Sequence, residues 1–141
     1  MTLKRKKQNI KLIGQSYDSN KEEFLSVSFR YFTNNKNFNF EKLDKNQKRK
    51  WKSALTERLI ELTQQSWIYW GNLTKEHGYE TLDAYLLSFS PTNYSLSDDE
   101  NITIFRFNSQ KGRIIGVKKA NNPTFYIIGI DTNFSAYDHG N

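Results

Sequence analysis

Three short apolar segments near the C-terminus constrain the fold of this 141-residue chain more than any other feature. They cover residues 102–107, 113–118 and 124–130, and a loop of five residues joins each to the next. The segments are rich in Ile, Phe and Val, which favour extended backbone. Loops this short make consecutive strands antiparallel neighbours. The sequence therefore predicts a three-stranded antiparallel meander.

Two further elements are predicted upstream of the meander. Residues 24–32 alternate between apolar side chains such as Leu25 and Val27 and polar ones such as Ser26, which is typical of a half-buried strand. Residues 41–65 show helical periodicity instead, with Asp44 as the expected N-cap and Gln47 three residues later. The predicted core-facing stripe of this helix consists of Trp51, Ala54, Leu55, Arg58, Leu59 and Leu62.

The region between the helix and the meander, residues 66–90, has a less regular pattern. We interpret it as a helical region, although residues 81–89 fit a second helix or a strand equally well. Its aromatic side chains either pack in the core or offer stacking surfaces for nucleotide bases. These aromatic residues are Trp67, Tyr69, Trp70, Tyr79 and Tyr85.

The element order predicts an α+β protein, with the long helix and the helical region packed on an antiparallel sheet of about four strands. Residues 1–20 carry a cluster of Lys and Arg and read as a basic N-terminal arm. Residues 21–141 then form a single α+β domain, which is an ordinary size for one core.

Composition narrows the classes of function. The chain has 21 Lys and Arg against 15 Asp and Glu, and this net charge of +6 favours an anionic partner such as nucleic acid. The absence of cysteine excludes disulfides, thiolate metal sites and cysteine nucleophiles. We expect a cytoplasmic protein with no membrane association, because the sequence has neither a signal peptide nor a long apolar run.

The best candidate site lies in the meander and the tail that follows it. Arg106 and Arg113 stand on the first two predicted strands, and the chain ends soon after Tyr137, Asp138 and His139. Arginine suits phosphate because its planar fork donates two hydrogen bonds and stays charged. The rival interpretations are that Arg106 lies on the solvent face of its strand and that the tail is frayed.

This arrangement resembles the RelE/ParE toxin superfamily, especially the YoeB-like messenger-RNA interferases that act on the ribosome. The resemblance rests on the predicted order β-α-α-β-β-β, on the stretch from Phe105 to Val117 with its two arginines, and on the short C-terminal tail. It covers residues 24–139 in topology and residues 102–139 in motif. The sequence does not identify the glutamate that acts as general base in that family.

The resemblance implies RNA cleavage without metal or cofactor, with the ribose 2′-hydroxyl as nucleophile. Arg113 would hold the phosphate, helped by Arg106, while His139 would act as acid or base, Tyr137 would stack or donate a hydrogen bond, and Asp138 would orient His139. The implied partners are RNA or the ribosome, together with a small antitoxin protein. Predicted contacts to nucleic acid are Lys4, Arg5, Lys6, Lys7, Lys48, Arg49, Lys52 and Lys111.

Two other functions fit the same sequence. The first is a non-enzymatic accessory protein of phage or plasmid type that binds nucleic acid or a protein and inhibits it. The second is a toxin that targets DNA gyrase rather than RNA. His77 lies between Glu76 and Glu80, but a single histidine with acidic neighbours is a weak metal signal.

Overall fold

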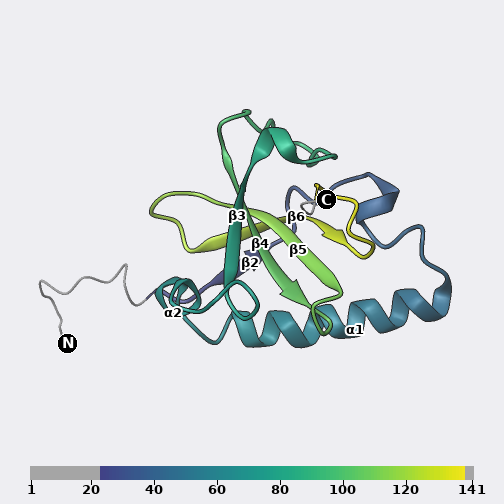
Figure 1. Ribbon diagram of the computed structural model, residues 1–141, viewed down its shortest axis with the longest axis horizontal. Coiled ribbons are helices and arrows are strands. Elements are labelled where there is room, and N and C mark those ends of the chain that lie inside the picture. The colour runs from purple at the N-terminus through teal and green to yellow at the C-terminus, as the bar shows by residue number, and fades with distance from the viewer. Residues whose placement is uncertain (1–22, 139–141) are drawn as a thin grey trace, which may run out of the picture.

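The computed structural model describes residues 23–138 of the chain, so the predicted arm over residues 1–20 and His139 lie outside the described residues. The described chain contains helices, strands and short 3₁₀ turns (Figure 1). In order they are β2 (Ser26–Ser28), η2 (Lys36–Phe38), α1 (Lys45–Leu62), α2 (Trp67–Gly71), β3 (Tyr79–Asp83), η3 (Ala84–Leu86), β4 (Asn101–Phe107), β5 (Gly112–Lys118) and β6 (Thr124–Asp131).

One five-stranded sheet organises the fold, in the order β2-β6-β5-β4-β3. The predicted α+β class is confirmed, and so is the meander of β4, β5 and β6, whose strands pair antiparallel. Strand β3 extends the antiparallel part of the sheet by pairing with β4. The prediction of a wholly antiparallel sheet is wrong at the other edge, because β2 pairs in parallel with β6. Alternating polarity identifies the faces of a strand but neither its partner nor its direction.

The first predicted strand is also shorter than expected. Only residues 26–28 are extended, and the Phe32 amide donates to the Phe29 carbonyl in the turn that follows. The turn reverses the apolar pattern, so Val27 packs against one core cluster while Tyr31 packs against the other. Phe29, predicted to face inward, is 43 % exposed.

Helix α1 forms as the periodicity predicts. The Asp44 carboxylate accepts a hydrogen bond from the Gln47 amide at 2.8 Å, which caps the first turn. Leu55 and Leu62 are buried on the sheet side. Together with α2, this helix covers the sheet face that carries Phe105, Phe107, Ile114, Phe125 and Ile127.

The helical interpretation of residues 66–90 holds for α2 and for the short 3₁₀ turn η3, and residues 81–89, which fit helix or strand, divide between β3, η3 and irregular chain. Residues 79–83 form β3, an edge strand in which Tyr79 lies opposite Phe105 and Glu80 lies opposite Ile104. Pairing with β4 over five residues decides the conformation of this segment, whose own pattern fits helix and strand equally. The sheet therefore has one strand more than the sequence suggests.

The second face of the sheet is covered as well. Its core cluster combines Ile102, Ile104, Ile115, Val117 and Ile128 with side chains from η2, η3, residues 87–96 and the C-terminal tail. The C-terminal end of the described chain folds back beside the sheet in Figure 1. Among residues 23–138, none of the helices combines the length and the apolarity needed to cross a bilayer.

Candidate active site

Arg106 and Arg113 lie directly opposite each other on β4 and β5. Arg106 follows Ile104 in the alternation of β4, and Arg113 precedes Ile115 in that of β5, so both arginines lie on the face opposite α1. The side chain of Arg106 is only 15 % exposed, and Arg113 is 7 % exposed. Arg106 is therefore not a solvent-facing strand residue.

The two arginines line a pocket of about 270 Å³, which we call the arginine pocket. Tyr137 and Asp138 from the tail line it too, so four of the five predicted catalytic residues meet here. The fifth, His139, follows directly in the sequence but lies outside the described residues. The complete lining is Lys75, Glu80, Leu82, Arg106, Arg113, Tyr137 and Asp138.

Arg113 is a buried cation that donates hydrogen bonds to backbone carbonyls. Its Nη1 donates to the carbonyls of Gln110 and Gly112 at 2.8 and 3.0 Å, and its guanidinium lies 5.1 Å from the Phe134 ring centroid. Its Nε is buried and makes no hydrogen bond within residues 23–138. Because a guanidinium is always charged and this one lines a pocket, the position favours an anionic ligand there.

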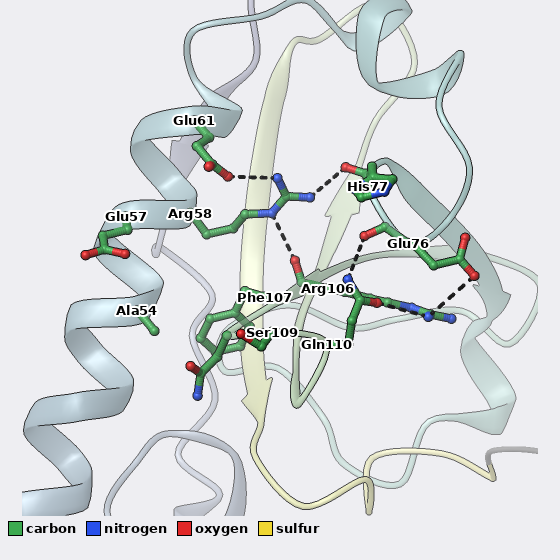
Figure 2. A pocket seen from close by; sticks show the side chains of 11 residues that line it. Ala54, Glu57, Arg58, Glu61, Glu76, His77, Arg106, Phe107, Ser109 and Gln110 are labelled. Atoms are coloured by element: carbon green, nitrogen blue, oxygen red, sulfur yellow. Dashed lines mark hydrogen bonds and ion pairs between the residues drawn. The ribbon is translucent and has the colours of Figure 1, made fainter.

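Arg106 is paired with acidic side chains. Its Nε lies 3.5 Å from a carboxylate oxygen of Glu80, and its Nη1 lies 3.9 Å from Glu76 and donates to Gln110 at 3.2 Å. Figure 2 shows the Arg106 side chain running between Glu76 and Gln110. Glu80 and Arg106 come together because both lie on the same face of adjacent strands, within reach of long side chains.

A second pocket, of about 300 Å³, is drawn in Figure 2. It shares Arg106 with the lining of the arginine pocket. Arg58 of α1 crosses the second pocket: Nε donates to the Arg106 carbonyl at 2.9 Å, and Nη2 donates to the His77 carbonyl at 2.7 Å. The predicted core position of Arg58 is thus a link between α1, β4 and the turn before β3. His77 itself is exposed in that turn.

The turn between β4 and β5 shapes both pockets. Asn108, Ser109 and Gln110 all have positive φ, at 54°, 55° and 71°, which is a strained series for residues other than glycine. The Gln110 side chain donates to the Glu76 carbonyl at 2.9 Å and accepts from Arg106. These bonds hold the strained turn against the site.

Tyr137 contributes a neutral phenol to the arginine pocket. Burial raises the pKa of its hydroxyl above the ordinary value, and the charge of Glu80 adds to the rise. A hydrogen bond with Arg113 and the charge of that arginine act in the opposite direction. The hydroxyl therefore stays protonated at neutral pH, and its oxygen accepts the hydrogen bond from the Arg113 guanidinium.

Asp131 fixes the tail that carries Tyr137. It is 1 % exposed and stands opposite Arg113 in the β5–β6 register. Its Oδ1 accepts from the amides of Asn133 and Ser135 at 3.1 and 3.2 Å, and its Oδ2 accepts from Ala136 at 2.9 Å. The carboxylate thereby turns the chain back onto the sheet immediately after β6.

We expect Asp131→Asn to lower the free energy of unfolding by about 1–3 kcal/mol, because an amide group replaces one of two buried charged acceptors. Urea denaturation measures this change, and faster hydrogen exchange at the Ala136 amide should accompany it. Asp98→Asn, in the exposed loop before β4, is the matched control and should stay within about 0.5 kcal/mol of wild type. Equal stability of the two variants would refute the anchoring role.

Three residues at or beside the arginine pocket are not predicted by the sequence pattern: Glu80, Lys75 and Asp131. Glu80 shares the alternation of Leu82, so interpreting residues 79–83 as a strand would have placed it on the arginine face. Asp131 ends β6 two residues before Asn133, a position typical of a side chain that caps a turn. Lys75 precedes β3, and no sequence signal relates it to the meander.

The predicted nucleic-acid contacts are dispersed. Lys4, Arg5, Lys6 and Lys7 fall outside the described residues, whereas Arg49, Lys52 and Lys111 are exposed and Lys48 is partly buried. The five aromatic side chains predicted to pack in the core or to stack on bases divide between buried and exposed positions. Trp70 is buried in the core and Trp67 and Tyr79 pack against it, while Tyr69 and Tyr85 are 43 % and 64 % exposed.

Acidic and histidine side chains do not form a cluster of three or more with metal-binding geometry anywhere in residues 23–138. Comparison with known proteins gives no match to any protein-family model, any curated protein or any solved structure.

Proposed function

We propose that this protein is a toxin-like RNA endonuclease whose active site is the arginine pocket. The observation that carries this proposal is the cross-strand pair of Arg106 and Arg113, which shares one pocket with Glu80 and Tyr137. Two fixed cations suit the charge that develops on a phosphate during cleavage, and a carboxylate and a phenol supply the proton chemistry. The resemblance of residues 102–139 to ribosome-dependent toxins implies the same reaction.

Glu80 is the proposed general base. It accepts the proton of the ribose 2′-hydroxyl, whose oxygen then attacks the neighbouring phosphorus. The bond from phosphorus to the 5′-oxygen breaks, which leaves a 2′,3′-cyclic phosphate and a 5′-hydroxyl. Glu80 now contacts Arg106 at 3.5 Å, so a bound phosphate would replace part of this ion pair and leave the carboxylate available as a base.

The remaining roles follow from the surroundings of each group. Arg113 binds the phosphate through its guanidinium, and Arg106 stabilises the added negative charge of the pentacoordinate state. The neutral hydroxyl of Tyr137 donates to the leaving 5′-oxygen, and the neighbouring His139 is the second candidate for this acid role. Asp138 lines the same pocket beside Tyr137.

The proposed substrate is messenger RNA on the ribosome, and the proposed regulator is a small antitoxin protein. The exposed cations Arg49, Lys52 and Lys111 would contact RNA phosphates. Contacts of this kind add affinity for RNA of any base sequence. An RNA substrate of this kind places the proposed activity in the cytoplasm.

A substrate that lacks one hydroxyl tests the reaction. The purified chain should cleave an all-ribose oligonucleotide, with or without added ribosomes, to products that end in a 2′,3′-cyclic phosphate. A single 2′-deoxy nucleotide at the cleaved position should abolish cleavage there and leave binding unchanged. Cleavage that persists at the deoxy position would contradict the proposal.

The second candidate function is non-enzymatic binding of nucleic acid. It is favoured by the internal bonds of both arginines, since Arg106 is paired with Glu80 and Glu76, and Arg113 donates to two carbonyls. Binding with a steep salt dependence, combined with no cleavage of any RNA on or off the ribosome, would establish this function instead.

A further inference from the structure

Three tyrosine rings surround the ammonium group of Lys119. Its Nζ lies 4.7 Å from the ring centroid of Tyr94, 5.5 Å from that of Tyr126 and 5.9 Å from that of Tyr31. The rings pack on one another, with Tyr31 centred 4.9 Å from Tyr94 and 5.3 Å from Tyr126. All three distances to the cation are within the range of about 6 Å over which a ring attracts a cation. We call these three residues the tyrosine cage.

The electrostatics around the cage also favour a cation. The Glu100 carboxylate accepts a hydrogen bond from the Tyr94 hydroxyl at 2.5 Å, and so adds a negative charge beside the rings. Burial and this carboxylate raise the pKa of Tyr94 to about 12. The guanidinium of Arg30 lies 5.5 Å from the Tyr31 ring centroid, so one of the three rings holds a second cation of the chain.

Lys119 is a weak occupant of this cage. Its residue is exposed on the loop after β5, and an ammonium ion is strongly hydrated, so it gives up water contacts to meet the rings. A quaternary ammonium group carries the same charge but has no N–H donors to leave unsatisfied. Aromatic cages bind such groups for this reason, and a ligand of that type would compete well with the lysine.

We propose that Tyr31, Tyr94 and Tyr126 form a binding site for a trimethylammonium group and that Lys119 occupies the site until such a ligand displaces it. The site is distinct from the arginine pocket, because the extended chain from Arg113 to Lys119 spans roughly 20 Å. It is also independent of the proposed RNA cleavage. Free choline, a choline headgroup or a trimethylated lysine of another protein carries the required chemistry.

Ligand titration followed through tyrosine ring resonances tests this site. Choline chloride should shift the resonances of the cage tyrosines in the wild-type chain, and Lys119→Ala should bind choline about 2- to 5-fold more tightly, because the competing cation is gone. Lys118→Ala is the matched control, since Lys118 contacts Trp67 instead of the cage, and it should bind as wild type does. The double variant Lys119→Ala/Tyr94→Leu should no longer bind choline. If this double variant does not fold, Tyr126→Leu is combined with Lys119→Ala instead and should have the same effect.

Two further probes separate charge from shape and identify the source of the ligand. The neutral isostere 3,3-dimethylbutan-1-ol should bind at least tenfold more weakly than choline to Lys119→Ala. A short peptide with one trimethyllysine should bind as well as choline if the natural ligand is a protein, and less well if it is a small molecule or lipid headgroup. Equal binding of alcohol and choline, or no binding of either cation to Lys119→Ala, would overturn the proposal.

Discussion

Glu80→Gln is expected to lower the rate of RNA cleavage by about 10²- to 10⁴-fold, the usual contribution of a positioned general base. The amide keeps the size and shape of the glutamate but cannot accept the 2′-hydroxyl proton. RNA affinity should stay the same or rise, because Arg106 loses its closest carboxylate at 3.5 Å and becomes available to phosphate. Single-turnover cleavage of a ribose oligonucleotide measures the rate, and binding to its 2′-deoxy analogue measures the affinity.

The matched control for this variant is Glu41→Gln, which makes the same chemical change at an exposed position between η2 and α1. It should leave both rate and affinity unchanged. If Glu80→Gln cleaves as fast as Glu41→Gln, then Glu80 is not the base. His139, which the family resemblance names as acid or base, would then be the next residue to test.

Phe105→Ala should lower the free energy of unfolding by about 3–5 kcal/mol, the cost of removing a fully buried aromatic side chain. Phe105 is 0 % exposed and lies at the centre of the aromatic cluster under α1 and α2. Its ring centroid is 5.3 Å from that of Phe125 and 5.5 Å from that of Tyr79. The free energy of unfolding of a whole domain is about 5–15 kcal/mol, so this single substitution would remove a large part of it. Urea denaturation followed by tryptophan fluorescence measures it.

Tyr85→Ala is the control for the loss of an aromatic ring, because Tyr85 is 64 % exposed, and it should change stability by less than about 0.5 kcal/mol. Phe105 and Arg106 are consecutive on β4, so the cavity should also loosen the arginine pocket. A change of less than about 1 kcal/mol in Phe105→Ala would mean that the cluster repacks and does not hold β4 in place.

The parts of the fold that can be predicted from the sequence, α1 and the meander, are those that leave a local pattern in the chain. Asp44 caps α1, and Leu55 and Leu62 face the sheet, as their spacing indicates. The meander follows from the apolar segments and their short loops, and its strands begin and end within one residue of the predicted bounds. These features depend on hydrogen bonds and burial among residues close in sequence, so the sequence alone contains the information.

Only part of the candidate site can be predicted from the sequence, because only some of its residues are close to one another in the chain. Arg106 and Arg113 are close in sequence and meet through a short hairpin, and the meander predicts this. Glu80 joins them only because residues 79–83 pair with β4 as a strand. The tyrosine cage likewise collects Tyr31, Tyr94 and Tyr126 from three distant segments.

Helix α1, the meander, the α+β class and the two arginines of the site thus follow from local sequence patterns. The tertiary structure decided that β2 runs parallel to β6, that β3 is a strand and not a helix, and that Asp131 folds Tyr137 over Arg113. These two groups of features differ in the sequence separation of the residues whose interactions produce them. Local periodicity fixes which side of an element is buried, but pairing between distant segments depends on the free energy of the whole folded chain.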